Sequence, residues 1–162
     1  SGPLNFQENG NFTISAWVHS ESVSSSKVIV GKCRYQYHLE IDRLKWNFSV
    51  FQDNRGWDFT DDPYSFGEWV HVCGVRKDSL QFLYVDGICV DNTINHTTDA
   101  ADRIDAFDLE IGRGTLPDGS HDFGYTGLID EVQISSKARS EDWVRLNYIN
   151  QKKDNLFLVF EK

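Results

Sequence analysis

The chain has 162 residues and a formal net charge of −9, with 16 Lys and Arg against 25 Asp and Glu. That length suits one domain with a sizeable core, and 40% hydrophobic residues with 14% aromatics exclude a disordered chain. The acidic balance argues against nucleic acid as a partner, because phosphate binding needs clustered Lys and Arg and the longest basic run is Lys152-Lys153. Membrane insertion is not expected, since no stretch approaches the roughly 20 apolar residues that span a bilayer.

The sequence contains no methionine, not even as an initiator, and it begins Ser1-Gly2-Pro3. These features predict a mature product or a domain cut from a longer chain, covalently linked to neighbouring domains. We expect residues 1–3 to be a remnant of cloning and residues 4–162 to form a single domain.

Short β-runs separated by turn residues recur about every ten residues, a spacing typical of an all-β sandwich or barrel. Apolar and polar residues alternate within these runs, as in Tyr37-His38-Leu39, which predicts sheets with one buried face. Tight hairpin turns are expected at Asp42-Arg43 and Asp86-Gly87. The expected strands span residues 12–18, 27–30, 34–41, 44–51, 69–76, 80–85, 88–90, 107–112 and 127–134.

Two stretches are expected to be loops, and one to be helical. Residues 53–67 are rich in turn residues, and residues 91–108 are polar without a steady period. Ser140 is the expected N-cap of a single short helix, because acidic residues follow it and apolar residues then recur at helical spacing. The apolar tail, residues 156–160, is expected to add a final strand.

The core is expected to take most of the large aromatic residues of the strands. Trp17 and Trp69 are assigned to it, and Tyr37 and Trp46 alternate with aliphatic neighbours on one face. The three cysteines, Cys33, Cys73 and Cys89, cannot all pair within one chain, and their spacing does not match a zinc site. They are therefore expected to be small buried hydrophobic residues.

Four ordered segments carry a family resemblance. They are Phe12-Thr13-Ile14-Ser15-Ala16-Trp17-Val18, Trp69-Val70-His71-Val72, Leu83-Tyr84-Val85-Asp86-Gly87 and Gly127-Leu128-Ile129-Asp130-Glu131-Val132. Over residues 4–150 the chain resembles the laminin-G-like jelly-roll domains of the concanavalin A-like lectin/glucanase superfamily, in the subset found in large secreted bacterial multidomain proteins. The resemblance implies an all-β, two-sheet antiparallel jelly-roll sandwich with one short C-terminal helix, in a secreted or cell-surface protein.

Retaining glucanases of this superfamily carry Glu-x-Asp-x-Glu on one strand, so that the nucleophile and the acid share a face. This chain has Glu40-Ile41-Asp42 without a third carboxylate at the required spacing, so the general acid/base is missing. His71 lies in mid-strand and is expected to be a hydrogen-bonded structural residue rather than a base. The domain is therefore not expected to be an enzyme.

Aromatic residues in polar loops are the first candidates for ligand contacts, because loops carry function and exposed rings mark interaction sites. Trp57, Phe59 and Tyr64 cluster in the predicted loop 53–67, and they are expected to bind a glycan. The alternative is that one or two of these rings fold back over the sandwich.

Further candidate contacts lie on one strand and in one loop. Phe82 and Tyr84 alternate with core positions and are expected to form an exposed aromatic face, with a second buried surface as the alternative. His121 lies in a glycine-rich loop between Asp118 and Asp122, where it is expected to touch the ligand.

A structural calcium ion is implied by the family resemblance, since domains of this fold commonly carry one and calcium takes oxygen ligands. The resemblance places one ligand at Asp130, with partner ligands from the shortened N-terminal segment, residues 5–9. The acidic loop residues Asp58, Asp61, Asp62, Asp118 and Asp122 are the alternative ligand sources.

Together these features predict a non-catalytic carbohydrate-binding accessory module that tethers a larger secreted protein to polysaccharide. The alternative is a structural spacer or a protein-interaction module without affinity for glycans. Substitution of a loop aromatic such as Trp57 by alanine separates the two, because a spacer has no affinity to lose.

Overall fold

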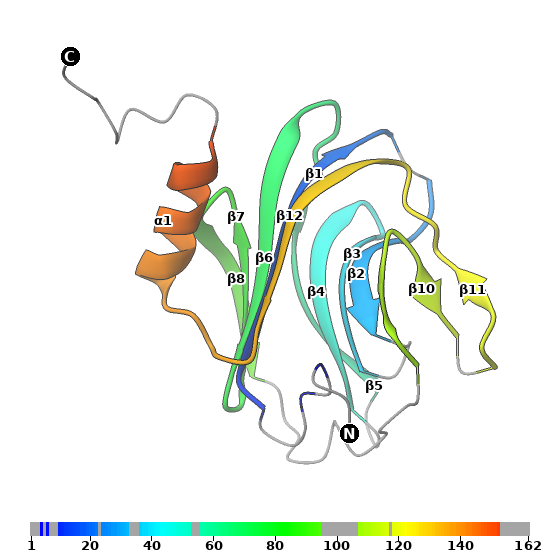
Figure 1. The fold of residues 1–162 in the computed structure, drawn as a ribbon, viewed down its shortest axis with the longest axis horizontal. Coiled ribbons are helices and arrows are strands. Elements are labelled where there is room, and N and C mark those ends of the chain that lie inside the picture. The colour runs from blue at the N-terminus through cyan, green and yellow to red at the C-terminus, as the bar shows by residue number, and fades with distance from the viewer. Residues whose placement is uncertain are drawn as a thin grey trace.

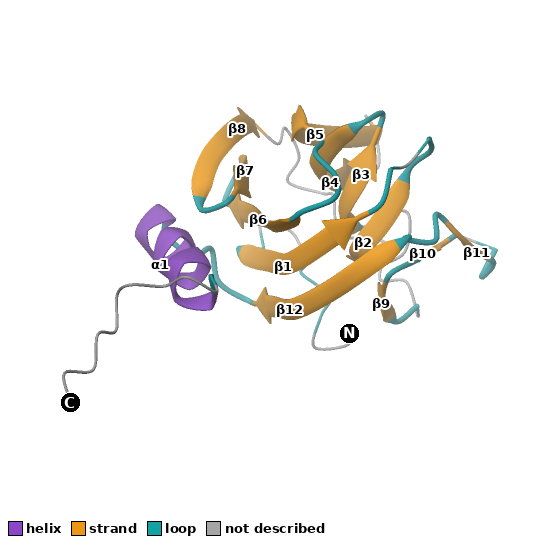
Figure 2. Ribbon diagram, turned by 90° about the horizontal axis from the view of Figure 1, so that it is seen from above, coloured by secondary structure: helices purple, strands orange, loops and turns teal. Residues whose placement is uncertain are grey.

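The computed structural model describes residues 4, 6, 10–22, 24–32, 36–52, 56–94, 107–116 and 118–152. These residues form two antiparallel five-stranded sheets packed face to face, with one helix outside the sandwich (Figures 1 and 2). The first sheet has the order β12 (Gly127–Ser135), β1 (Phe12–Ser20), β6 (Trp69–Lys77), β7 (Leu80–Val85) and β8 (Ile88–Ile94). The second has the order β5 (Gly56–Pro63), β4 (Lys45–Gln52), β3 (Tyr37–Asp42), β2 (Lys27–Lys32) and β9 (Leu109–Ile111). The predicted fold class is confirmed.

The core lies between the two sheets and follows the alternation seen in the sequence. Every second residue of the central strands is buried there, including the predicted Tyr37 and Trp46. Phe48 packs edge-on against Phe12, with ring centroids 5.8 Å apart. It also faces Gly74 on the opposite sheet so closely that a Cβ atom there would lie 2.3 Å from Phe48 Cδ2. The two sheets therefore meet most tightly where a ring of one fills the space above a glycine of the other.

Two expected loops contain strands. Residues 56–63 of the predicted loop 53–67 form β5, and β8 extends through Ile94 into the predicted loop 91–108. β5 is polar, but it pairs with β4 at the edge of its sheet, where backbone hydrogen bonds rather than apolar alternation define a strand. A short hairpin, β10 (Gly114–Thr115) and β11 (His121–Asp122), was also not expected. The predicted tail strand, residues 156–160, lies outside the described residues.

The hairpin turns follow their sequence signatures. Asp86 and Gly87 have φ values of 50° and 77°, which match the type I′ turn predicted from Asp-Gly. The β3–β4 hairpin turns one residue later than expected, at Arg43 and Leu44, with φ values of 50° and 61°. Both turns thus use two left-handed residues, whose twist suits antiparallel strands.

The helix α1 (Glu141–Gln151) packs on the outer face of the first sheet. Val144 of the helix joins Cys73, Val75 and Tyr84 in a second buried cluster. Cys73 is therefore the small core residue that was predicted, and burial raises the pKa of its thiol. Cys73 and the half-buried Cys89 are free thiols, whereas Cys33 lies outside the described residues. No helix in the described ranges is long and apolar enough to cross a membrane.

Ser140 is the N-cap of α1, as predicted, and its Oγ accepts a hydrogen bond from the Trp143 backbone N–H at 3.2 Å. Ser140→Ala removes this acceptor, so we expect the free energy of unfolding to fall by about 1 kcal/mol. Urea unfolding followed by circular dichroism measures the change. The matched control is Ser136→Ala, at an exposed site before the helix, which is expected to change stability by less than about 0.5 kcal/mol. Equal effects of the two substitutions would contradict the capping role.

Candidate functional site

A cavity of about 680 Å³ lies where the C-terminal half of α1 meets the outer face of the first sheet. Its lining combines aromatic, acidic and amide side chains. The lining residues are Trp17, Trp69 and Tyr148; Glu68, Asp86, Asp130 and Glu131; and Asn150, Gln151 and Lys152. We call this cavity the helix pocket.

Two tryptophans assigned to the core line the helix pocket instead. Trp17 is half-buried and Trp69 is 43% exposed, so their assignment to the core is wrong. The physical reason is alternation: Ala16 and Val18 point into the sandwich, which turns Trp17 to the outer face. Trp17 pairs in register with Asp130, which places both on the same side of the sheet.

Trp17, Trp69 and Tyr148 form the aromatic wall of the helix pocket. Contacts from the helix and from the sheet hold this wall in place. The ring of Trp17 stacks on Tyr148, with centroids 5.6 Å apart and an interplanar angle of 22°. Trp17 Nε1 donates a hydrogen bond to Gln151 Oε1 at 2.8 Å, and Gln151 Nε2 in turn donates to Glu131 Oε2 at 3.5 Å. Trp69 packs edge-on against His19, with centroids 5.8 Å apart. These contacts fix the rings before any ligand arrives.

Backbone N–H groups orient two of the carboxylates. Asp86 Oδ1 accepts from the His71 N–H at 2.9 Å, and Asp130 Oδ1 accepts from the Glu131 N–H at 2.8 Å. Burial raises the pKa of Asp86, and the hydrogen bond from His71 and the charge of Lys152 only partly oppose this. The pocket thus holds one carboxylate in surroundings that penalise its charge.

His71 lies beneath the aromatic wall and is buried, with its ring 5.5 Å from Trp17 and 6.0 Å from Tyr148. Neither ring nitrogen has a hydrogen-bond partner within the described part of the chain, which differs from the hydrogen-bonded residue that was expected. Desolvation by burial lowers the pKa of His71 to about 4, so the ring is neutral at pH 7. The residue supports the pocket as a neutral ring.

Acid should therefore destabilise the fold through His71. The pKa of this ring falls from 6.5 to about 4 on folding, so the unfolded chain binds more protons between these pH values. The contribution to stability is complete above pH 6.5 and is lost as the pH falls toward 4. We expect a loss of about 2 kcal/mol between pH 7 and pH 5 relative to His71→Phe, which cannot titrate. Urea unfolding of both proteins at the two pH values measures it, and parallel profiles would contradict it.

The predicted glycan contacts of segment 53–67 lie in and beside β5. Trp57 and Phe59 pair in backbone register with Phe51 and Ser49, and their side chains are outside the described part of the structure. Tyr64 packs edge-on against Trp46 at the border of the core, with centroids 4.9 Å apart. Tyr64 therefore follows the alternative, a ring folded back over the sandwich.

Phe82 and Tyr84 lie beneath α1. Tyr84 is 5% exposed and Phe82 is half-buried, so the expected exposed face is wrong for Tyr84. The helix covers this part of the outer face, and sequence alternation cannot show such a cover. Burial, the largest of several causes, raises the pKa of Tyr84 to about 12.

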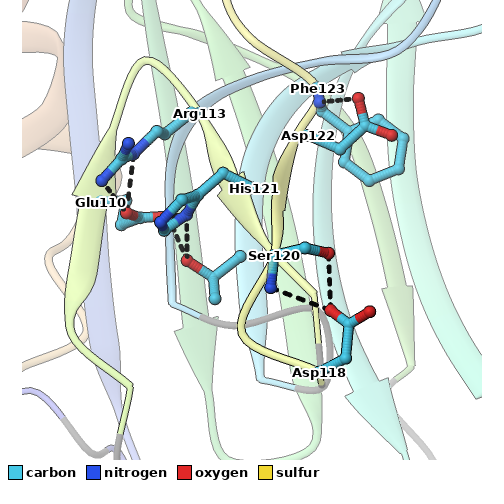
Figure 3. A network of polar contacts seen from close by, with 8 residues as sticks. Glu110, Arg113, Asp118, Ser120, His121, Asp122 and Phe123 are labelled. Atoms are coloured by element: carbon cyan, nitrogen blue, oxygen red, sulfur yellow. Dashed lines mark hydrogen bonds and ion pairs between the residues drawn. The ribbon is translucent and has the colours of Figure 1, made fainter.

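His121 belongs to a polar network around the β10–β11 hairpin (Figure 3). Its Nδ1 lies 3.3 Å from Glu110 Oε2, while Arg113 pairs with the other oxygen of Glu110 at 2.7 Å. Burial opposes ionisation of Glu110, but hydrogen bonds from Thr115 and Arg113 and nearby positive charge outweigh it and lower the pKa of that carboxyl. His121 and Glu110 are absent from the lining of the helix pocket, so the structure does not bring His121 together with Trp17 and Trp69.

Asp130, the expected calcium ligand, lines the helix pocket. No group of three or more His, Cys, Asp or Glu side chains converges as a metal site within the described ranges. The partner ligands expected from residues 5 and 7–9 lie outside those ranges. The described carboxylates by themselves do not fit calcium, and the ion stays a prediction.

Sequence reasoning missed most of the helix pocket. Ile14, Ala16 and Val18 occupy alternate positions of one strand and face the core. Trp17 lies between two of them, so alternation could have placed it on the outer face. Tyr148 and Gln151 carried no such signal, because their role depends on where the helix docks.

Comparison with known proteins identifies the family to which this fold belongs. Residues 1–145 match the family model described as the concanavalin A-like lectin/glucanases superfamily. A candidate carbohydrate-binding protein of Bacteroides ovatus is 18% identical, with a TM-score of 0.73, and the match covers 92% of this chain and 43% of that one. The CBM40 domain of Ruminococcus gnavus IT-sialidase, bound to α2,3-sialyllactose, is 16% identical, with a TM-score of 0.74 and coverages of 90% and 85%.

The receptor-binding domain of the botulinum neurotoxin C/D mosaic serotype is 16% identical, with a TM-score of 0.63 and coverages of 88% and 37%. The chain therefore spans less than half the length of the Bacteroides and neurotoxin chains. Identities this low show a shared fold. No curated protein matches the chain.

Proposed function

The chain belongs to the concanavalin A-like lectin/glucanase superfamily, and from that premise we propose that it is a non-catalytic carbohydrate-binding module whose ligand occupies the helix pocket. One observation carries the proposal: three aromatic rings and several planar polar side chains line the same cavity. Aromatic faces stack on the C–H faces of sugars, and carboxylates and amides bond their hydroxyls. The neighbouring folds that bear carbohydrate-binding names support the same function.

The size of the helix pocket suits a short stretch of glycan. Its volume of about 680 Å³ falls inside the range of roughly 300–1,000 Å³ that is typical of small-ligand sites. Gln151 and Tyr148 also hold the ring of Trp17 in place, so binding does not have to order this ring.

The two carboxylates of Glu40-Ile41-Asp42 contact neighbouring side chains in and beside their own sheet. Glu40 accepts a hydrogen bond from Ser49 Oγ at 2.9 Å and lies 3.5 Å from His38. Asp42, at the end of the same strand, accepts from Ser26 Oγ. Both carboxylates are thus engaged by neighbouring side chains, in keeping with the missing third carboxylate of the glucanase pattern.

We propose that this module is extracellular, as an accessory domain of a larger secreted or cell-surface protein. There it would tether attached domains to a polysaccharide and raise their local concentration at it. The short span of the chain against the Bacteroides protein is compatible with such an arrangement.

Affinity electrophoresis tests the function. The purified domain is run through gels containing soluble xylan, glucan, mannan, pectin, arabinan or chitosan, with calcium and with chelator. Retardation in one polysaccharide is the expected result, and its loss in chelator would assign a role to calcium. Uniform mobility in all gels, together with no pull-down on insoluble cellulose and chitin, would overturn the proposal in favour of a spacer.

A further inference from the structure

Negative charge dominates the helix pocket. Four carboxylates line it, those of Glu68, Asp86, Asp130 and Glu131, against one ammonium group, that of Lys152. The whole chain adds to this field with its net charge of −9. A ligand that brings its own carboxylate would meet repulsion from several sides.

The single cation does not offset this charge. Lys152 Nζ donates to Tyr148 Oη at 3.1 Å and lies 5.4 Å from the centroid of the Tyr148 ring. Burial raises the pKa of Asp86 and the charge of Glu68 adds to this, while the hydrogen bond from His71 and the charge of Lys152 only partly oppose it. A second positive charge beside Asp86 would therefore be stabilising.

Two of the carboxylates keep an oxygen for a ligand. The hydrogen bonds that orient Asp86 and Asp130 both use Oδ1 and come from backbone N–H groups. Within the described residues, Oδ2 of each carboxylate makes no hydrogen bond and no ion pair. Both oxygens can therefore accept hydrogen bonds from a ligand.

The aromatic wall favours a cation as well. An ammonium group over the face of a tryptophan or tyrosine is attracted by the ring quadrupole, and a neighbouring carboxylate strengthens the site. Trp69, which is 43% exposed, provides such a face next to the acidic side chains, whereas the Tyr148 ring already stacks on Trp17 and contacts Lys152.

We propose that the helix pocket selects glycans that carry free, protonated amino groups, and that it disfavours acidic glycans. The inference rests on the proposed function and narrows it to a class of ligand, amino sugars without N-acetylation. Sugar rings would stack on the tryptophans while their ammonium groups bond Asp86 and Asp130.

Calorimetry with three tetrasaccharides of equal length tests the selectivity: glucosamine, N-acetylglucosamine and galacturonic acid. We expect the free amine to bind roughly tenfold more tightly than the N-acetylated form, the size of one charge-assisted contact. The galacturonic tetramer should bind most weakly. Affinity for the amine should also fall as salt is added and as the pH is raised until the amine loses its proton.

Asp86→Asn and Asp130→Asn supply the matched variants, because asparagine keeps the Oδ1 acceptor and removes the charge. Each should weaken binding of the free amine more than binding of the N-acetylated tetramer, so that the preference for the amine falls severalfold. Asp78→Asn is the control: it removes an exposed carboxylate from the opposite end of β6 and should change neither affinity.

The outcomes separate this inference from the proposed function. Equal binding of the amine and N-acetylated forms, or tightest binding of the acidic tetramer, would overturn the charge selectivity and leave a carbohydrate-binding module. Absence of binding to the three tetrasaccharides, with uniform mobility in every polysaccharide gel, would overturn both.

Discussion

Replacing Phe48 by alanine is expected to lower the free energy of unfolding by about 3–5 kcal/mol. The ring is fully buried between the sheets, and it contacts Phe12 on one strand and lies over Gly74 on another. Its removal would leave a cavity that two hydrogen-bonded sheets cannot close by collapsing. Urea unfolding followed by tryptophan fluorescence measures the change, and a loss below about 1 kcal/mol would contradict the packing described for this site.

Gly74→Ala tests the same contact from the other side. The added Cβ would lie 2.3 Å from the Phe48 ring, so we expect it to destabilise the fold by about 1–3 kcal/mol. Combined with Phe48→Ala, the same change should cost much less, since the new methyl group then enters the vacated space. Additive effects would show that the two positions are not coupled. Phe66→Ala, at a side chain that is 59% exposed, is the control for loss of an aromatic ring.

The second large effect concerns binding. Trp69→Ala is expected to weaken affinity for the selected polysaccharide by roughly 30-fold, or about 2 kcal/mol, as for an aromatic residue at the centre of an interface. Trp69 lines the helix pocket and is 43% exposed, so its loss removes a stacking face without emptying the core. Retardation in affinity gels and calorimetry with the purified variant measure the effect.

Phe66→Ala serves again as the matched control, because this exposed aromatic residue does not line the helix pocket. Its affinity should equal that of the unsubstituted protein. If Trp69→Ala kept full affinity while the fold stayed intact, the glycan would bind elsewhere, and the helix pocket would lose its assigned role. The two variants together thus distinguish a local effect from a general loss of surface aromatics.

The β class, most strands, the helix with its Ser140 cap and the Asp86-Gly87 turn could all be predicted from the amino-acid sequence. All of these depend on local rules. Alternation with a period of two identifies a strand with one buried face, and a cap or a type I′ turn needs only neighbouring residues. The polar edge strand β5 was missed for the same reason, because its pairing with β4 rather than its own pattern makes it a strand.

The position of α1 on the outer face of the first sheet, and with it the helix pocket, depends on tertiary packing. Alternation places Trp17 and Tyr84 on an outer face, but it cannot tell that α1 covers one and borders the other. The hydrogen bond from Trp17 to Gln151 joins residues 134 positions apart, and the docking of the helix creates both this contact and the pocket. Such contacts follow from the packing of whole elements, which no periodicity in the chain encodes.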